Sequence, residues 1–339
     1  MRARALFLIV SLAAAQAAAA QEPLLSVRNN AEKQELIFEI GPLHLEADAG
    51  HDGVRQPKAQ SIALPISGYL HGFTTEMLDA AGNTIPSRLL HHVNIIAPER
   101  RELFSEIMQR VGAAGSETGP VFIPRFLGYP VSAGDSLLFT AMFHNPTGES
   151  YHNARLRIRM RYTADRTWHP RVAIQPFYLD VMPPAGGHAY DLPPGRSTRS
   201  GEGKPAVSGR VVALGGHLHK YGVALRLENL TEGKVLFEST PGLDEDGNVV
   251  AMPRKYFLWR LGIPLNASHT YRLTAIYDNP TGETLAGGGM GALGGVFVPA
   301  DSGRWPAVDR QHPEYQYDVK FTYEGSHGGH GGHGGHSGH

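Results

Sequence analysis

Two histidines separated by one residue are the clearest candidates for metal chemistry in this sequence. His217 and His219 lie in GGHLHKYG (215–222), within a segment that has the character of a β-strand. Alternate side chains of a strand point to the same face, so the two imidazoles would lie side by side. Neutral imidazole suits copper, zinc, iron and nickel, and an added thioether shifts the preference towards copper. The pair therefore predicts one metal site that needs a further, distant ligand.

A second candidate site contains adjacent histidines, His91 and His92, in LLHHVNI (89–95). Neighbouring residues of a regular strand face opposite ways, so both can bind one ion only if the backbone twists or bulges there. His144, on another predicted strand, is the candidate third ligand. The other histidines before the C-terminal tail are interpreted as solvated or hydrogen-bonded residues: His44, His51, His71, His152, His169, His188, His269 and His312.

An internal repeat connects the two sites. FTAMFHNPTGES (139–150) returns as LTAIYDNPTGET (273–284), and each copy lies downstream of a histidine pair. Asn-Pro-Thr-Gly is turn chemistry, because Pro sets φ and Gly tolerates positive φ. The repeat predicts two similar tandem domains, 21–165 with the HH site and 166–325 with the HxH site. In this alignment Asp278 occupies the position of His144.

Short apolar alternations between turn signals predict an all-β fold of two antiparallel, jelly-roll-like β-sandwiches. They include ELIFEI, LHLEAD, SLLFTAMFH, ARLRIRMRY, VAIQPFYLDV, VALRLEN, KVLFES, YRLTAIYD and YDVKFTY. Residues 98–111 are expected to form one helix, with Leu103, Ile107 and Val111 as its apolar stripe. Residues 183–206 are expected to be a long loop, and LDEDGN (243–248) a hairpin turn rather than a calcium loop.

Composition and the chain ends suggest an extracytoplasmic protein. The 339 residues carry 31 Lys and Arg against 32 Asp and Glu, so no basic field predicts nucleic-acid binding. There is no cysteine, so any transition-metal site must use His, Met, Asp or Glu. Residues 1–20 have the features of a cleavable secretory signal peptide, which predicts a secreted or periplasmic product without a membrane anchor. The Gly- and His-rich tail, 326–339, is expected to be disordered and to bind extra metal ions.

Over about residues 60–325 the sequence resembles the copper type II, ascorbate-dependent monooxygenases, such as the peptidylglycine α-hydroxylating and dopamine β-monooxygenases. LLHHVNI matches the HH strand of this family, and GGHLHKYG matches its HTHLTG-type segment. HNPTGES, followed by ARLRIRMRY, is similar to the segment around the third histidine of the dopamine enzyme. GGGMGALGGVFV is similar to the Gly-rich approach to the family's methionine ligand.

The resemblance implies two copper ions per chain. His91, His92 and a third ligand would store and deliver an electron, while His217, His219 and a thioether would bind O₂ and hydroxylate a C–H bond of a small-molecule substrate. Ascorbate or another reductant would supply two electrons. Catalysis is thus assigned to His217, His219 and Met290.

Several positions depart from the family pattern. Its third ligand at the first site aligns with Met142; His144 is favoured because imidazole serves Cu(II) better, with Met142 as the substitute. Its methionine at the second site aligns with Val296, whereas Met290 lies six residues earlier and Asp278 is a further candidate.

The substrate-binding positions also differ. An Arg that helps to bind the substrate carboxylate in the amidating enzyme is Gly215 here, and the Asn and Tyr partners correspond to Val298 and Ala300, so peptide amidation is not expected. The alternatives are a non-catalytic copper-handling protein on the same fold and a β-sandwich binding module with a structural zinc site.

Overall fold

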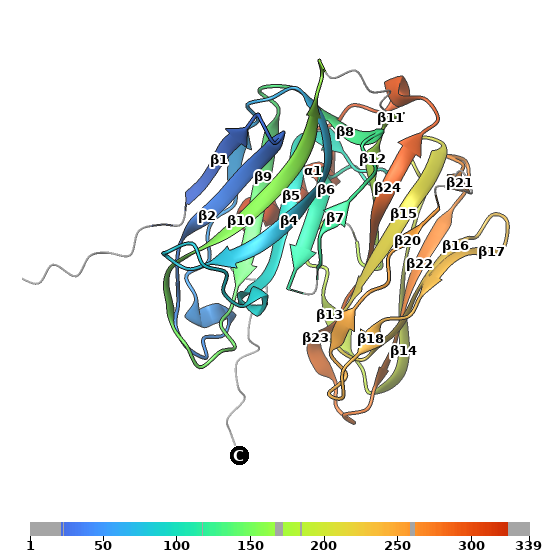
Figure 1. Cartoon of the computed structure of the whole chain (residues 1–339). Helices are drawn as coiled ribbons and strands as arrows, with labels where there is room; N and C mark the ends of the chain where they lie inside the picture. The colour runs from blue at the N-terminus through green and yellow to red at the C-terminus, as the bar shows by residue number, and fades with distance from the viewer. Residues whose placement is uncertain are drawn as a thin grey trace, which may run out of the picture.

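The chain folds into two β-sandwiches that lie side by side (Figure 1). The structure is a computed structural model and describes Glu22 and residues 24–116, 118–166, 172–183, 185–257 and 262–324. The expected signal peptide and the His-rich tail lie outside these residues, as does the inter-domain segment 167–171.

The first sandwich packs a seven-stranded sheet, ordered β1-β2-β10-β4-β8-β11 with β7 on β4, against a four-stranded sheet, β3-β9-β5-β6. Their bounds are β1 Leu24–Asn30, β2 Glu35–Leu45, β3 Gln60–Ala63, β4 Gly68–Leu78, β5 Leu90–Arg101, β6 Met108–Gly115, β7 Val121–Phe122, β8 Leu127–Val131, β9 Ser136–Phe143, β10 Tyr151–Ala164 and β11 Val172–Ala173, with short 3₁₀ helices at His51–Gly53 and Ser87–Leu89. Alternate residues of β9, such as Phe139 and Phe143, fill the core between the sheets.

The second sandwich packs β12-β24-β15-β20, with β21 on β15, against β14-β22-β16-β17, beside the small pairs β13-β23 and β18-β19. Their bounds are β12 Gln175–Asp180, β13 Tyr190–Leu192, β14 Gly195–Gly203, β15 Gly209–Leu218, β16 Gly222–Asn229, β17 Lys234–Ser239, β18 Gly242–Leu243, β19 Val249–Ala251, β20 Lys255–Tyr256, β21 Ile263–Leu265, β22 Tyr271–Asn279, β23 Leu285–Gly289 and β24 Gly291–Pro299, followed by a 3₁₀ turn at Ser302–Arg304. The strand orders are those of two jelly rolls, which is the predicted fold class.

The two sandwiches repeat one another strand by strand. The order β2-β10-β4 in the first corresponds to β12-β24-β15 in the second, and β3-β9-β5-β6 corresponds to β14-β22-β16-β17. The Asn-Pro-Thr-Gly turns also match: Thr147 N–H donates to Asn145 Oδ1, as Thr281 N–H does to Asn279 Oδ1. Each Asn side chain then donates to a carbonyl four residues later, at 2.7 Å. The repeated motif is therefore a repeated structure.

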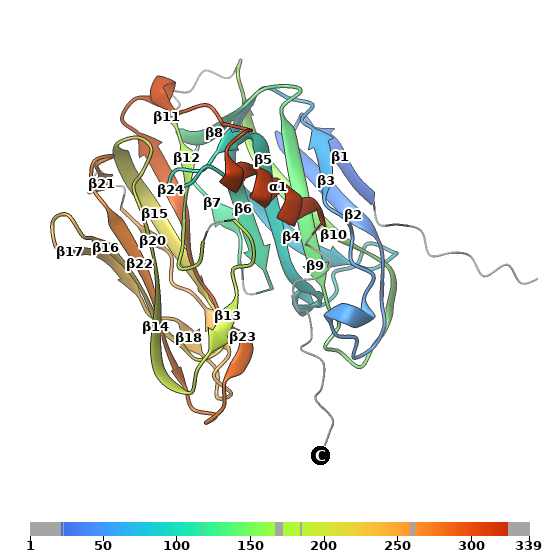
Figure 2. The same ribbon diagram turned by 180° about the vertical axis from the view of Figure 1, so that it is seen from behind.

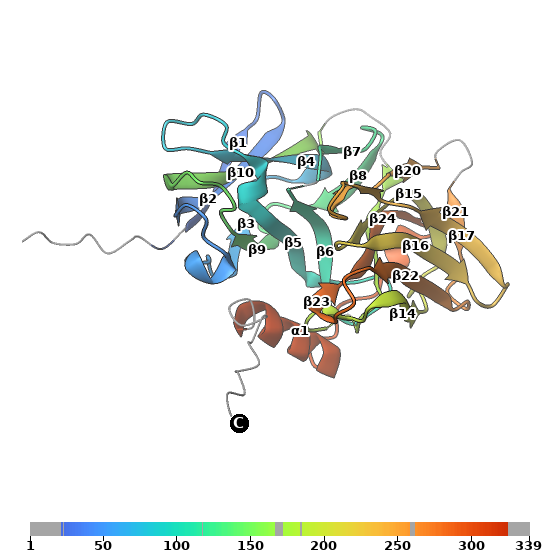
Figure 3. The ribbon, with the colours of Figure 1, turned by 90° about the horizontal axis from the view of Figure 1, so that it is seen from below.

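The C-terminal helix α1, Pro313–Glu324, packs on the first sandwich although the chain reaches it after the second (Figure 2). Tyr315 joins Ile96, Met108 and Leu138 in a small core on the outer face of the four-stranded sheet. Seen from below, α1 covers this face close to β6, the edge strand against which β12 of the second sandwich packs (Figure 3).

Three predicted elements were wrong. Residues 98–111 form the end of β5, a turn and the start of β6, because the supposed stripe is divided: Leu103 enters the second core, whereas Val111 packs on the first. YDVKFTY (317–323) is not a strand but part of α1, whose buried residues are Tyr315, Asp318 and Thr322. The expected loop 183–206 contains β13 and β14, because β14 pairs with β22 along its whole length. The hairpin at LDEDGN is confirmed between β18 and β19.

Candidate metal centres

The first histidine cluster is built on a β-bulge at His91. Leu90 pairs with Phe143 and His92 with Met142, so β5 accommodates one extra residue opposite β9. The backbone irregularity that adjacent histidine ligands require is thus present. The Nδ1 atoms of His91 and His92 lie 3.0 Å apart. Two nitrogens bound to one ion at about 2.0 Å lie roughly 2.8–3.3 Å from each other, so this spacing suits a shared metal ion.

His144 and Met142, the two candidates for the third ligand, both lie beside the His91–His92 pair. The ring centroids of His144 and His91 are 5.6 Å apart. Nε2 of His144 is 2.7 Å from the carbonyl oxygen of Arg88. Because a carbonyl only accepts hydrogen bonds, Nε2 carries a hydrogen, which is the way in which metal-binding histidines are commonly oriented for binding through the other nitrogen. Met142, directly opposite His92, shares its face of the sheet.

A small pocket of about 310 Å³ is lined by neighbours of the cluster residues. It reaches Leu90, which precedes His91, and Gly115, the strand partner of His92 on β6. The other lining residues are Thr75, Glu76, Met77, Ser87, Ser116, Thr118, Gly119 and Leu156. None of His91, His92, Met142 and His144 lines this pocket, so it is not assigned as a substrate site of the cluster.

The second cluster lies where β15 separates from β24. The rings of His217 and His219 have centroids 5.3 Å apart and are nearly perpendicular, at 88°. His217 pairs with Ala292 and Leu218 with Gly291, the first residue of β24. Met290 immediately precedes Gly291, so extending this register by one residue places Met290 opposite His219. Leu218 is buried in the second core, which places both imidazoles on the outer face of their sheet.

A buried tyrosine joins the two segments of this second cluster. The hydroxyl of Tyr277 on β22 accepts hydrogen bonds from the backbone N–H of His219, at 2.9 Å, and of Met290, at 3.1 Å. It donates to the carbonyl of Met290. Burial raises the pKa of Tyr277 to about 12, so the phenol stays protonated at neutral pH. Sequence reasoning missed this residue; the signal was the repeat, in which Tyr277 replaces Phe143.

The aligned position Val296 and the alternative ligand Asp278 lie elsewhere. Val296 is opposite Ala213, well along β24 from the histidines. Asp278 follows the inward-facing Tyr277, so it points out of the β14-β22-β16-β17 sheet, whereas the HxH pair lies on the opposite sheet. Of the two candidate ligands, Met290 and Asp278, Met290 is the one that lies beside the histidine pair.

The side chain of Arg254 covers Gly215. A Cβ at Gly215 would lie 3.3 Å from Cγ of Arg254. The guanidinium of Arg254 donates to the carbonyls of Gly119, at 2.9 Å, and Pro120, at 2.6 Å, in the first sandwich. Arg254 therefore links the two sandwiches at Gly215, which lies two residues before His217.

The two clusters do not occupy equivalent strands of the repeat. His91 and His92 lie at the start of β5, which corresponds to β16, whereas His217 lies near the end of β15, which corresponds to β4. The first pair follows the connection from β4 to β5. The second pair lies at the start of the equivalent connection, from β15 to β16. Each pair thus precedes its copy of the repeated turn, as the sequence shows, but from a different strand. Within the described residues, no group of three or more His, Asp or Glu is placed to hold a metal ion as it stands.

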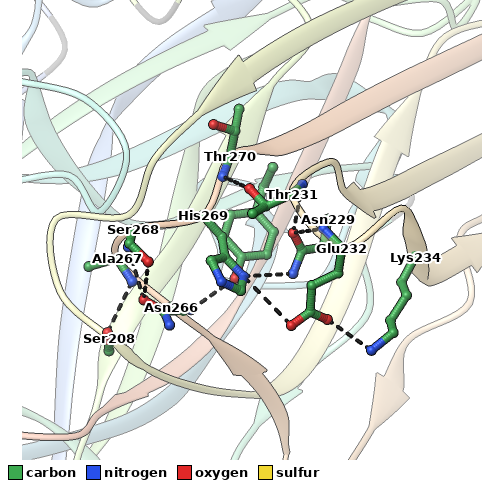
Figure 4. A network of polar contacts seen from close by, with 11 residues as sticks. Ser208, Asn229, Thr231, Glu232, Lys234, Asn266, Ala267, Ser268, His269 and Thr270 are labelled. Atoms are coloured by element: carbon green, nitrogen blue, oxygen red, sulfur yellow. Dashed lines mark hydrogen bonds and ion pairs between the residues drawn. The ribbon is translucent and has the colours of Figure 1, made fainter.

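Histidines outside the clusters take part in ordinary polar contacts. His269 lies in a loop network in which its Nδ1 is 3.0 Å from Asn229 Nδ2 and 3.9 Å from a Glu232 carboxylate oxygen (Figure 4). The buried ring of His71 contacts the carbonyl of Leu127 and the hydroxyl of Thr163, both at 2.6 Å. These contacts confirm the interpretation of His71 and His269 as hydrogen-bonded residues. The side chain of His51, and His169, are outside the described part.

Comparisons with known proteins add little to this site. No protein-family model matches the chain, and no curated protein matches it. Among solved structures it is similar to PNGF-II, with a TM-score of 0.38 and 11% identity, over 82% of this chain and 62% of that one. It is also similar to the Broad Bean Stain Virus structure, with a TM-score of 0.32 and 9% identity, over 86% and 94% of the two chains. Such scores carry no functional argument. In the described part of the chain, no helix has the length and apolarity to cross a membrane.

Proposed function

We propose that this protein is a secreted or periplasmic copper-dependent monooxygenase that hydroxylates a C–H bond of a small molecule. The observation that carries the proposal is the chemical difference between the clusters. His91, His92 and His144 offer imidazoles, whereas His217 and His219 lie beside the thioether-bearing Met290. Imidazoles with a thioether tolerate both Cu(I) and Cu(II), as the centre of a copper monooxygenase requires.

Two features support copper: the imidazole and thioether donor set, and the spacing of the His91 and His92 nitrogens. Copper, when bound, would supply one-electron redox chemistry and a position for O₂. The overall reaction would consume the substrate C–H bond, O₂, two electrons and two protons, and would yield an alcohol and water. Ascorbate or another two-electron reductant would provide the electrons, one through each centre.

The protein's own groups prepare the two centres differently. The carbonyl of Arg88 accepts a hydrogen bond from Nε2 of His144, which orients the ring for binding through the other nitrogen. At the second centre, glycines at 215 and 294 leave the strand surface beside His217 without side chains, and Arg254 packs along it. The guanidinium of Arg254 donates its hydrogen bonds to the carbonyls of Gly119 and Pro120. We therefore do not propose that it binds a substrate carboxylate, as an arginine does in the amidating enzyme.

The decisive experiment combines metal stoichiometry with O₂ uptake. Protein that ends at Gly325, and so lacks the His-rich tail, is loaded with copper, dialysed and examined by EPR. We expect two copper ions per chain, one after His217→Ala and two after His152→Ala, an exposed histidine control. We also expect ascorbate-dependent O₂ uptake that His217→Ala abolishes. Two bound coppers without uptake for any substrate would favour the copper-handling alternative; no bound copper would refute both.

A further inference from the structure

The hydroxyl of Tyr277 makes every hydrogen bond that a phenol can make, and both partner residues belong to the second cluster. A phenol has one hydrogen to donate and two lone pairs to accept with. Tyr277 uses all three, towards His219 N–H, Met290 N–H and Met290 C=O. The side chain is completely buried, so no part of this bonding competes with bulk water.

Core packing alone does not require this hydroxyl. At the corresponding position of the first sandwich, Phe143 is equally buried and has no polar atom. Burying a hydroxyl is unfavourable unless it is hydrogen-bonded, so the second sandwich gains from Tyr277 only through its partners. Those partners are the two segments that carry the candidate ligands His219 and Met290.

The contact also lies at a structurally weak point. The ladder between β15 and β24 ends with Leu218 opposite Gly291. One residue further on each strand, His219 and Met290 would begin to separate, since Met290 is outside both β23 and β24. The tyrosine hydroxyl accepts from both N–H groups at this step. It thereby replaces the missing backbone ladder and keeps the strand ends together.

We propose that Tyr277 is the positioning residue of the second metal centre. Its hydroxyl fixes His219 and Met290 side by side before any metal binds, so that their side chains and that of His217 can approach one ion without reordering the backbone. This inference rests on the proposed function. It predicts that the hydroxyl contributes to metal affinity at the second centre and not at the first.

The test compares Tyr277→Phe with Tyr271→Phe on the mature full-length chain. Tyr271 lies on the same strand, is also buried and accepts one backbone N–H, from Asn266, at 2.8 Å. Copper(I) is titrated against a chromophoric chelator, and His217→Ala marks the loss of the second centre; all variants share the same tail. We expect Tyr277→Phe to weaken binding at the second centre about 10- to 100-fold, and Tyr271→Phe to leave it unchanged.

Equal binding by the two Phe variants would overturn the positioning role. No difference between the wild type and His217→Ala would instead refute the proposed metal centre itself, so the two failures are distinct. Amide hydrogen exchange of the metal-free wild-type protein is a second test, and it does not depend on the folding of a variant. His219 and Met290 should exchange much more slowly than the exposed Lys220; exchange as fast as that of Lys220 would contradict the contact.

Discussion

The guanidinium of Arg110 on β6 and the carboxylate of Asp318 on α1 form an ion pair, with Nη1 2.7 Å from Oδ2. Asp318 is completely buried and also accepts the N–H of Met108, at 3.1 Å. The pair attaches the C-terminal helix to the first sandwich, where Tyr315 supplies the apolar contact. The buried side of α1 includes the polar residues Asp318 and Thr322, so the helix has no continuous apolar stripe that would have identified it in the sequence.

Removing one partner of this pair should be strongly destabilising. Asp318→Ala leaves the largely buried guanidinium of Arg110 without this carboxylate, and we expect a loss of about 3–5 kcal/mol in the free energy of unfolding by urea. Gln316→Ala, at an exposed position of the same helix, should change it by less than about 0.5 kcal/mol. Similar small losses for both variants would mean that α1 is not held by the ion pair.

Glu102 should make stability fall as the pH rises. Burial raises the pKa of this carboxyl to about 7, although the N–H and charge of Arg110 oppose the shift. Between its unfolded value of 4.5 and about 7, the folded chain holds a proton that the unfolded chain has lost. The contribution of Glu102 is thus fully present below pH 4.5 and is lost as the pH rises to about 7, with a slope of about 1.4 kcal/mol per pH unit.

The measurement is the urea stability of the wild type and Glu102→Gln from pH 4.5 to 8. A neutral amide cannot titrate, so the stability of the wild type relative to the variant should decrease across this window. Glu106→Gln, a partly exposed neighbour paired with Arg101, serves as the control and should follow the wild-type profile. A constant difference between the wild type and Glu102→Gln would show that Glu102 does not retain its proton.

Much of the architecture follows from the sequence because its periodicity is local. Strands such as β10 and β22 bury alternate residues, and the Asn-Pro-Thr-Gly turns are formed by their own side chains. The errors have another cause. Residues 98–111 contribute Leu103 and Val111 to different cores, and a helical stripe assumes a single core.

The candidate sites were predictable in part for the same reason. Adjacent histidines on a strand require a bulge, and one occurs at His91. Tyr277 could not be assigned, because its role depends on contacts 58 and 13 residues away in the chain. The same holds for Arg254, which lies over Gly215 only because β20 pairs with β15, at Lys255 and Leu214.

The repeated turn should contribute comparably in both sandwiches. Asn279 donates to the carbonyls of Leu192 and Glu283 and is 1% exposed, so Asn279→Ala leaves buried polar groups without partners. We expect a loss of about 2–4 kcal/mol in the free energy of unfolding, and a similar loss for Asn145→Ala. Asn266→Ala, in an exposed turn, should lose under about 1 kcal/mol. Equal effects at all three positions would show that burial of the turn does not matter.

The choice between Met290 and Asp278 can be decided by the oxidation state that each ligand favours. Met290→Leu keeps the apolar volume but removes the sulfur, and a soft thioether stabilises Cu(I) more than Cu(II). We therefore expect Met290→Leu to reduce Cu(I) affinity at the second centre about tenfold, equivalent to about 1.4 kcal/mol, and to lower its reduction potential. Asp278→Asn should change neither, because Asp278 faces out of the opposite sheet. Competition titration and potentiometry measure both quantities; a loss confined to Asp278→Asn would contradict the placement of Met290 beside the histidines.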